Sequence, residues 1–185
     1  MNLKDHIRAI PDFPQEGFVF YDTSTLLLEP LAWRYAIDRL AGAVADCKPD
    51  MLAGIESRGF LLAAPLAFKL GLGLITVRRA GSLLRRPAAR GDRKAKAVST
   101  FEVEADAVRP GQRIVVLDDV LATGRTMKVA VEVLRQCGAR IVAGACLVEL
   151  AFDNGRAQLD FPLITLVAFD DDDLIRHITS KPAGA

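Results

Sequence analysis

Two adjacent carboxylates end an apolar stretch in the middle of the chain and precede a short Thr/Gly loop, in the sequence LDDVLATGRT. Asp118 and Asp119 stand where carboxylate oxygens can accept hydrogen bonds from sugar hydroxyls. The backbone N–H groups of Ala122 to Thr126, at the start of a predicted helix, can bind a phosphate dianion. This order of residues predicts a site for a phosphorylated sugar, whereas two acids alone could merely cap a loop.

The loop contains the residue types that close approach to a phosphate requires. Gly124 lets the backbone come near the ligand, and Thr123 and Thr126 add hydroxyl donors. Neither the Walker sequence G-x-x-x-x-G-K-[ST] nor the dinucleotide fingerprint G-x-G-x-x-G is present, so two common nucleotide motifs are excluded.

Periodic segments on both sides of this motif predict the elements that must position it. Apolar residues at helical spacing predict helices over 31–46, 58–71 and 126–137, and short apolar runs predict buried strands over 51–57, 74–79, 114–119 and 141–148. Buried strands that alternate with helices are typical of an α/β fold with a mainly parallel sheet, whose ligands bind at the carboxyl ends of the strands. The alternating segment TFEVEA predicts a strand with Glu102 and Glu104 on a solvated face, and FDDDD predicts acids at a helix N-terminus.

Composition limits the class of protein. The 185 residues fit one domain, and 24 Lys/Arg against 23 Asp/Glu give no overall basic field, so wholesale nucleic-acid binding is not expected. The three cysteines show no metal-binding or C-x-x-C spacing and indicate reduced thiols in a cytoplasm. No apolar run is long enough to cross a bilayer, and the start of the sequence lacks the apolar core of a signal peptide.

Taken with the rest of the chain, LDDVLATGRT resembles the phosphoribosyl-diphosphate motif of the type I phosphoribosyltransferases. Further segments resemble the adenine phosphoribosyltransferases among them, in order and spacing, from Ile7 to Phe169: IPDFPQEGFVFYD, GIESRGF, VRRAGS, RPGQR and LVEL. The resemblance implies the type I phosphoribosyltransferase fold, with a mainly parallel sheet flanked by helices and a small N-terminal hood. It also implies a single domain over 1–185, with the hood at 1–30 and a mobile lid loop at 80–99.

The resemblance implies that the chain joins adenine to phosphoribosyl diphosphate with Mg²⁺, giving AMP and pyrophosphate in purine salvage. Ala122 to Thr126, with Arg125 among them, would hold the 5′-phosphate, and Asp118 and Asp119 would bind the ribose hydroxyls. The Mg²⁺ would rest on the substrate near this acid pair, with no direct protein cage. The remaining implied residues are Ser57, Arg58, Arg78 and Arg79 for the diphosphate, and Val19, Phe20 and Tyr21 for the base. Arg58 would act in catalysis together with the acid pair, and the protein would form a homodimer.

The sequence departs from the family pattern at three places. Arg125 stands where adenine enzymes usually have a second glycine, and Tyr21 replaces the usual arginine of F-R-D. The third departure is AGSLLRRPAARGDRKAKAVS, residues 80–99, which holds six Lys/Arg against one acid. Ungapped counting puts Ala95 on the family glutamate expected to handle the adenine proton, Asp92 and Lys96 on its tyrosines, and Ser82 on its usual lysine.

These departures leave alternatives open. One is a phosphoribosyltransferase of another base, motivated by Arg125 and Tyr21. Another is a non-catalytic relative that binds phosphoribosyl diphosphate or AMP, motivated by an intact phosphate motif beside an altered lid. A third, a nucleic-acid-binding basic arm at 80–99, is disfavoured because the segment has no aromatic residue for stacking. Paired compensating frameshifts within this segment would also explain a mismatch of unchanged length.

Overall fold

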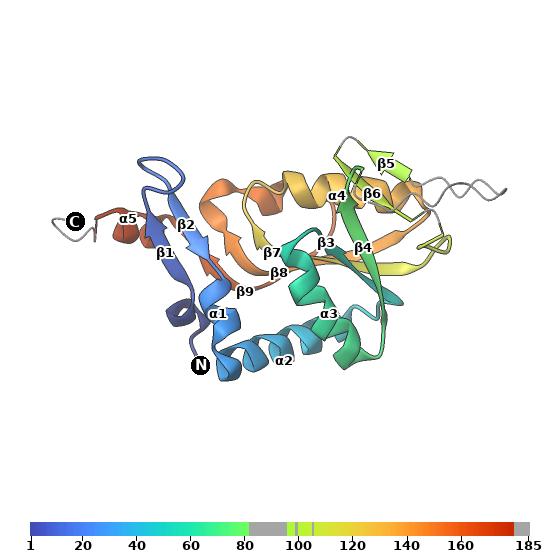
Figure 1. The fold of residues 1–185 in the computed structure, drawn as a ribbon, viewed down its shortest axis with the longest axis horizontal. Helices are drawn as coiled ribbons and strands as arrows, with labels where there is room; N and C mark the ends of the chain where they lie inside the picture. The colour runs from blue at the N-terminus through green and yellow to red at the C-terminus, as the bar shows by residue number, and fades with distance from the viewer. Residues whose placement is uncertain (82–95, 99, 105, 180–185) are drawn as a thin grey trace.

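A computed structural model describes residues 1–81, 96–98, 100–104 and 106–179. Its centre is a seven-stranded sheet with the strand order β5-β6-β4-β3-β7-β8-β9 (Figure 1). Five strands run parallel: β3 (Met51–Ile55), β4 (Gly73–Arg79), β7 (Arg113–Leu121), β8 (Arg140–Leu150) and β9 (Leu163–Phe169). At one edge β5 (Lys96–Val98) and β6 (Phe101–Val103) add antiparallel strands. The predicted α/β class with a mainly parallel sheet is confirmed.

Helices cover both faces of the sheet, which is why its strands are apolar along most of their length. The helices α2 (Pro30–Asp46) and α3 (Arg58–Leu70) pack on one face, and α4 (Arg125–Gln136) packs on the other (Figure 1). Along β7 the side chains alternate between the two cores, with Val115 and Leu117 toward α3 and Ile114 and Val116 toward α4. This alternation continues into the acid pair at the end of the strand.

The predicted helices agree closely with the observed ones. Four apolar residues that recur at helical spacing in this part of the sequence are all buried on the inner face of α4, namely Met127, Ala130, Val131 and Leu134. A glycine lies just beyond the end of both α3 and α4, where Gly71 and Gly138 have positive φ angles of 67° and 92°. Such a backbone conformation closes a helix at little cost only for a residue without a side chain.

A two-stranded antiparallel hairpin forms the N-terminal part of the structure. It consists of β1 (Arg8–Pro11) and β2 (Val19–Asp22) and is preceded by a 3₁₀ turn at Leu3–His6. The helix α1 (Ser24–Leu28) leads from the hairpin to α2, and α5 (Asp171–Thr179) packs beside the hairpin at the other end of the chain (Figure 1). Three aspartates occupy the first turn of α5, as predicted, where the helix dipole favours negative charge.

The prediction for Glu102 was wrong. Glu104 is exposed as expected, but Glu102 is buried and its carboxylate accepts a hydrogen bond of 3.0 Å from the N–H of Gly81. The reason is that β6 pairs with β4, placing Glu102 opposite Arg78, beneath the turn that follows β4. No helix in the described part of the chain combines the length and apolarity that crossing a membrane requires.

Candidate active site

A cavity of about 420 Å³ opens at the carboxyl ends of the parallel strands. This is the edge of the sheet where α/β folds bind ligands, because each loop that follows a strand contributes to the same crevice. Its walls come from four separate parts of the chain: Val19, Phe20 and Tyr21 of the hairpin, Glu56, Ser57 and Arg58 after β3, Arg79 of β4, and Asp118, Asp119, Val120, Ala122, Thr126 and Leu150 around β7 and β8.

The acid pair lies on the floor of this cavity, with its two side chains on opposite faces of β7. Asp119 is buried, forms an ion pair with Arg58 Nη1 at 3.0 Å and accepts a hydrogen bond from Thr23 Oγ1 at 3.2 Å. The Oδ1 atom of Asp118 accepts a 3.0 Å hydrogen bond from the Asp119 N–H. Arg58 and Thr23 therefore fix the Asp119 carboxylate, whereas Asp118 accepts a hydrogen bond from the main chain of its neighbour, and both acids line the cavity.

Asp118 carries the clearest electrostatic perturbation at this edge of the sheet. Burial, together with the negative charge of Asp119, raises the pKa of Asp118 from 3.8 to about 7, while the hydrogen bond from the Asp119 N–H and the positive charge of Arg58 oppose the shift. A ligand that brings hydroxyl donors or positive charge would stabilise the ionised form of this carboxyl group. A perturbed acid in a cleft is a general indication of a functional site.

The segment Ala122 to Thr126, which we call the phosphate loop, joins β7 to α4. Gly124 has a φ angle of 77° and is the N-cap of α4, so the loop turns tightly into the helix, and Gly124 itself does not line the cavity. Ala122 and Thr126 line the cavity, whereas the side chains of Thr123 and Arg125 are exposed and lie outside its lining.

The segment after β3 brings a guanidinium group across the cavity. Ser57 is the N-cap of α3, and the Arg58 guanidinium lies 5.7 Å from the centroid of the Phe20 ring while it pairs with Asp119. Arg79 also lines the cavity, and its backbone N–H donates to Glu56 Oε2 at 2.6 Å. Arg78 does not line the cavity, although the sequence predicted a diphosphate contact for both arginines.

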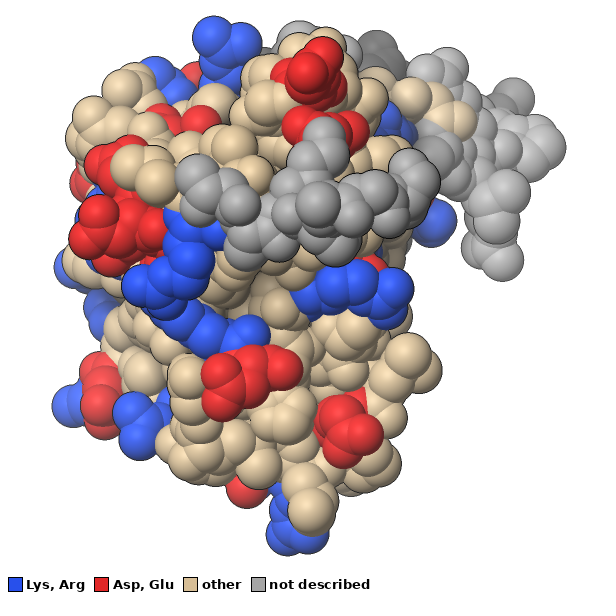
Figure 2. Space-filling view, turned by 90° about the vertical axis from the view of Figure 1, so that its left-hand side faces the viewer, with Lys and Arg blue, Asp and Glu red and all other residues tan. Residues whose placement is uncertain are grey.

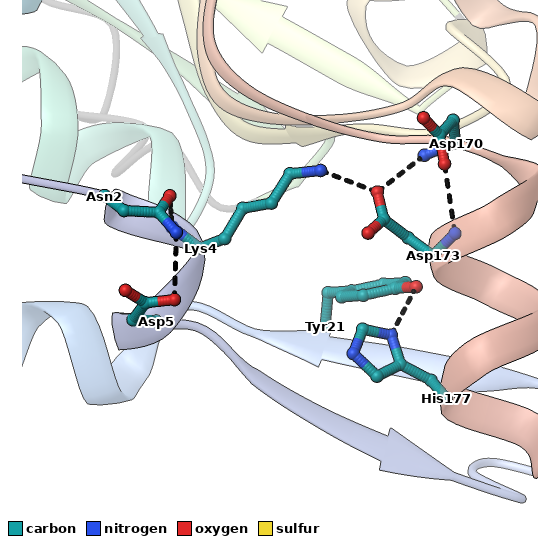
Figure 3. Close-up of polar contacts among 7 residues, drawn as sticks. All are labelled: Asn2, Lys4, Asp5, Tyr21, Asp170, Asp173 and His177. Atoms are coloured by element: carbon teal, nitrogen blue, oxygen red, sulfur yellow. Dashed lines mark hydrogen bonds and ion pairs between the residues drawn. The ribbon is translucent and has the colours of Figure 1, made fainter. Parts of the chain in front are cut away.

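Tyr21 occupies an unusual place for a residue predicted to contact the base. Its side chain is only 2% exposed, and its ring stacks on Phe169 with 4.1 Å between centroids. The hydroxyl forms a 3.2 Å hydrogen bond with Nδ1 of His177 in α5, as Figure 3 shows. Burial, with Asp173 and Asp170 nearby, raises the pKa of Tyr21 to about 12. Its hydroxyl thus ties β2 to α5, while the neighbouring Phe20 contributes its ring to the cavity.

The ion pair around this contact fixes α5 against the N-terminus. Lys4 Nζ pairs with Asp173 Oδ2 at 2.6 Å, and Asp170 and Asp173 exchange reciprocal backbone-to-side-chain hydrogen bonds at the start of the helix (Figure 3). On the face that carries the hairpin and α5, positive and negative side chains are interspersed (Figure 2). Among the described residues visible on that face, neither sign of charge forms an extended patch.

Some residues of the site were given no role from the sequence. Thr23, which donates to Asp119, directly follows the segment IPDFPQEGFVFYD. Three further residues line the cavity and lie within the quoted motifs without a predicted role, namely Glu56, Val120 and Leu150. Most of the lid predicted at 80–99, namely residues 82–95 and 99, lies outside the described residues. Among the described residues, no group of three or more His, Cys, Asp or Glu side chains could hold a metal ion.

Comparisons with known proteins define the class of this chain. Residues 28–165 match the model of the phosphoribosyl transferase domain. The curated adenine phosphoribosyltransferase of Rhodospirillum rubrum is 52% identical over 170 residues, which are 92% of this chain and 99% of that protein. That of Acidiphilium cryptum shows the same identity and coverage.

Solved structures agree with this assignment. The crystal structure of adenine phosphoribosyltransferase from Thermoanaerobacter pseudethanolicus superposes with a TM-score of 0.80 at 38% identity, covering 90% of this chain and 98% of that one. The Saccharomyces cerevisiae enzyme, complexed with an imino-altritol bisphosphate and adenine, gives a TM-score of 0.77 at 33% identity, covering 88% and 95%. The fold is thus the type I phosphoribosyltransferase fold, and the chain belongs to the adenine phosphoribosyltransferase family, a family of pentosyltransferases.

Proposed function

We propose that the chain transfers the phosphoribosyl group of phosphoribosyl diphosphate to adenine, releasing pyrophosphate and AMP. The observation that carries this proposal is the convergence of the acid pair, the phosphate loop, Arg58 and the hairpin on one cavity, in a chain of this family. The alternatives of another base or of a purely binding role are less favoured, because relatives that share half of this sequence over nearly its full length are adenine phosphoribosyltransferases.

The acid pair would bind the ribose, and the phosphate loop would fix its 5′-phosphate. In the reaction the bond from C1′ to the diphosphate breaks, the electron pair leaves with pyrophosphate, and a base nitrogen bonds to C1′ and releases a proton. Positive charge develops on the ribose meanwhile, so the carboxylates of Asp118 and Asp119 stabilise the transition state. Ser57, Arg58 and Arg79 would bind the leaving diphosphate, and their position in the lining of the cavity supports this role.

The hairpin would supply the base site. Phe20 offers an aromatic face to the cavity, and the flat main chain of Val19 and Tyr21 supplies hydrogen-bonding groups beside it. The Arg58 guanidinium lies over the Phe20 ring. A purine stacked on this ring would therefore have to displace Arg58 toward the diphosphate.

The site suits a substrate-borne Mg²⁺. Burial and the negative charge of Asp119 raise the free energy needed to ionise Asp118, and a nearby divalent cation would lower it. When bound, the ion would neutralise charge on the diphosphate. Asp118 and Asp119 would then face it through water and the ribose hydroxyls.

Turnover with a panel of bases tests the proposed reaction. We expect AMP from adenine and phosphoribosyl diphosphate in the presence of Mg²⁺, with guanine, hypoxanthine and uracil at least about 100-fold less efficient, because a site built to hydrogen-bond one base leaves its polar groups unpaired with another. The measurement is product formation by chromatography. Folded protein that binds phosphoribosyl diphosphate without forming any nucleotide would contradict the proposal.

Substrate binding should depend on pH through Asp118. Its pKa of about 7 means that the ligand-free enzyme holds a proton there below neutrality, and binding of ribose hydroxyls and Mg²⁺ must release it. We expect KM for phosphoribosyl diphosphate to fall about fivefold between pH 6 and 7 and about tenfold in all by about pH 8, where it levels off.

The substrate phosphate titrates in the same range, so an Asp118→Asn variant is the control that separates the two effects. Conversely, the proton held by folded Asp118 stabilises the ligand-free fold below about pH 4, and this contribution is lost as the pH rises through about 7. Equal pH profiles of KM in wild type and variant would exclude Asp118 as the titrating group.

The remaining assignments are also proposals. We infer a homodimer, supported by large apolar side chains that are exposed on α1 to α3, namely Leu28, Leu31, Leu61 and Phe68. A cytoplasmic location is supported by three cysteines without a disulfide, Cys47, Cys137 and Cys146. We further propose one domain over 1–185, with the hood at 1–30 and the lid at 80–99.

A further inference from the structure

Gly155 lies behind the phosphate loop, in the connection from β8 to β9. This connection forms two 3₁₀ turns, Ala151–Asp153 and Gly155–Gln158, joined by Asn154 with a φ angle of 54°. We propose that Gly155 is a positioning residue that holds the phosphate loop in the shape that binds the 5′-phosphate of the substrate. The inference rests on the proposed function and assigns a role to a segment outside the phosphoribosyl-diphosphate motif.

The two backbones meet without any side chain between them. A Cβ atom on Gly155 would lie 1.9 Å from the Ala122 carbonyl oxygen and 2.7 Å from the Gly124 nitrogen. In the opposite direction, a Cβ atom on Gly124 would lie 2.7 Å from the Gly155 carbonyl oxygen. Both glycines are buried. Because the clashing atoms belong to the main chain, a methyl group on either glycine would have to displace the loop itself.

An ion pair fixes Gly155 from its other side. Arg156 Nε donates to Glu149 Oε1 at 2.8 Å, and Arg156 Nη2 donates to Glu149 Oε2 at 2.5 Å, so the pair is bidentate. Arg156 Nη1 also donates to the Leu163 carbonyl oxygen at 2.9 Å, which ties the connection to β9. Glu149 is buried at the end of β8, and such charge-assisted pairs are geometrically specific.

This arrangement transmits position from the sheet to the loop. Glu149 lies at the end of β8 and binds Arg156 through the ion pair. Arg156 in turn holds the adjacent Gly155, whose main chain packs directly against that of Ala122 and Gly124. The residues proposed for the diphosphate, Ser57, Arg58 and Arg79, follow other strands and do not touch Gly155 in this chain of contacts. A change at Gly155 should therefore weaken recognition of the 5′-phosphate and spare that of the diphosphate and the base.

Titration calorimetry with two probes tests this separation. For Gly155→Ala we expect ribose 5-phosphate to bind at least about tenfold more weakly than to wild type, with pyrophosphate within about twofold. In steady-state assays, KM for phosphoribosyl diphosphate should rise by a similar factor while KM for adenine stays within about twofold. Gly42→Ala is the matched control, because a Cβ atom at Gly42 meets nothing within 4 Å.

A second variant, Glu149→Gln, keeps the side-chain shape and removes the ion pair, and so remains informative if Gly155→Ala fails to fold. We expect it to weaken ribose 5-phosphate binding about threefold or more, again with little effect on pyrophosphate. Unchanged ribose 5-phosphate binding in both variants, or equal losses for both probes, would overturn the inference. Wild-type protein that binds pyrophosphate but no ribose 5-phosphate would instead contradict the proposed phosphate loop, and the inference with it.

Discussion

Replacing Asp118 and Asp119 together by asparagine is expected to lower kcat/KM for phosphoribosyl diphosphate about 1000-fold. Each carboxylate lines the cavity and is proposed to accept a charge-assisted hydrogen bond from a ribose hydroxyl, and such a bond contributes about 1.5–3 kcal/mol. Two of them contribute roughly 3–6 kcal/mol, which corresponds to about 10²–10⁴ in rate at 25 °C. Asparagine preserves the volume and hydrogen-bonding reach of each side chain but removes the negative charge that stabilises the ribose in the transition state.

A matched control carries the same change of charge at an exposed acid pair. Asp171 and Asp172 also adjoin in the sequence, lie in the first turn of α5 and are exposed, so their double asparagine variant should retain full activity. Circular dichroism must show that both double variants are folded. If the Asp118 and Asp119 variant kept more than about a tenth of wild-type kcat/KM, the acid pair would have no direct part in the reaction.

Replacing Arg58 by alanine is expected to lower kcat/KM about 100-fold. The guanidinium is proposed to bind the leaving diphosphate, and loss of one such preorganised donor typically slows catalysis about 10²–10³-fold. The change also removes the 3.0 Å partner of Asp119 and leaves that buried carboxylate with Thr23. Lysine at this position should recover part of the loss, because it restores the charge without the planar fork of donors.

The measurement for Arg58 is a steady-state assay with phosphoribosyl diphosphate as the varied substrate, joined to titration with pyrophosphate. Arg34→Ala is the control, since Arg34 has an 83% exposed side chain on α2, remote in sequence from the cavity lining. An effect on adenine binding alone would reassign Arg58 to the base, through its position over Phe20.

Local pattern determined the elements and the phosphate loop. The apolar run of β7, the helical spacing of Met127, Ala130, Val131 and Leu134, and the glycines after α3 and α4 each specify structure over a few residues. Such signals act within one strand or one helical turn, so they are visible in the sequence without any knowledge of neighbours. The chemistry of LDDVLATGRT is local for the same reason, since the carboxylates and the loop share one strand and one helix start.

Where the fold overrode the pattern, the cause was a partner far away in the chain. Glu102 alternates like a surface residue, but the pairing of β6 with β4 buries it beneath Gly81. Tyr21 is itself predicted to contact the base and lines the cavity, but its hydroxyl forms a hydrogen bond with His177, 156 residues later, which no sequence pattern predicted. Neither contact has a short-range signal.

By itself the sequence determined an α/β chain with a phosphate loop after its best strand, and the type of chemistry that this loop supports. Only the tertiary structure decided which distant groups share the cavity: Thr23 and Arg58 on Asp119, the Phe20 ring beneath Arg58, and Gly155 against the loop. The physical reason is that hydrogen bonds and steric contacts act over a few ångströms in space, whereas these partners are separated along the chain by tens of residues and meet only when the parallel strands align their carboxyl ends.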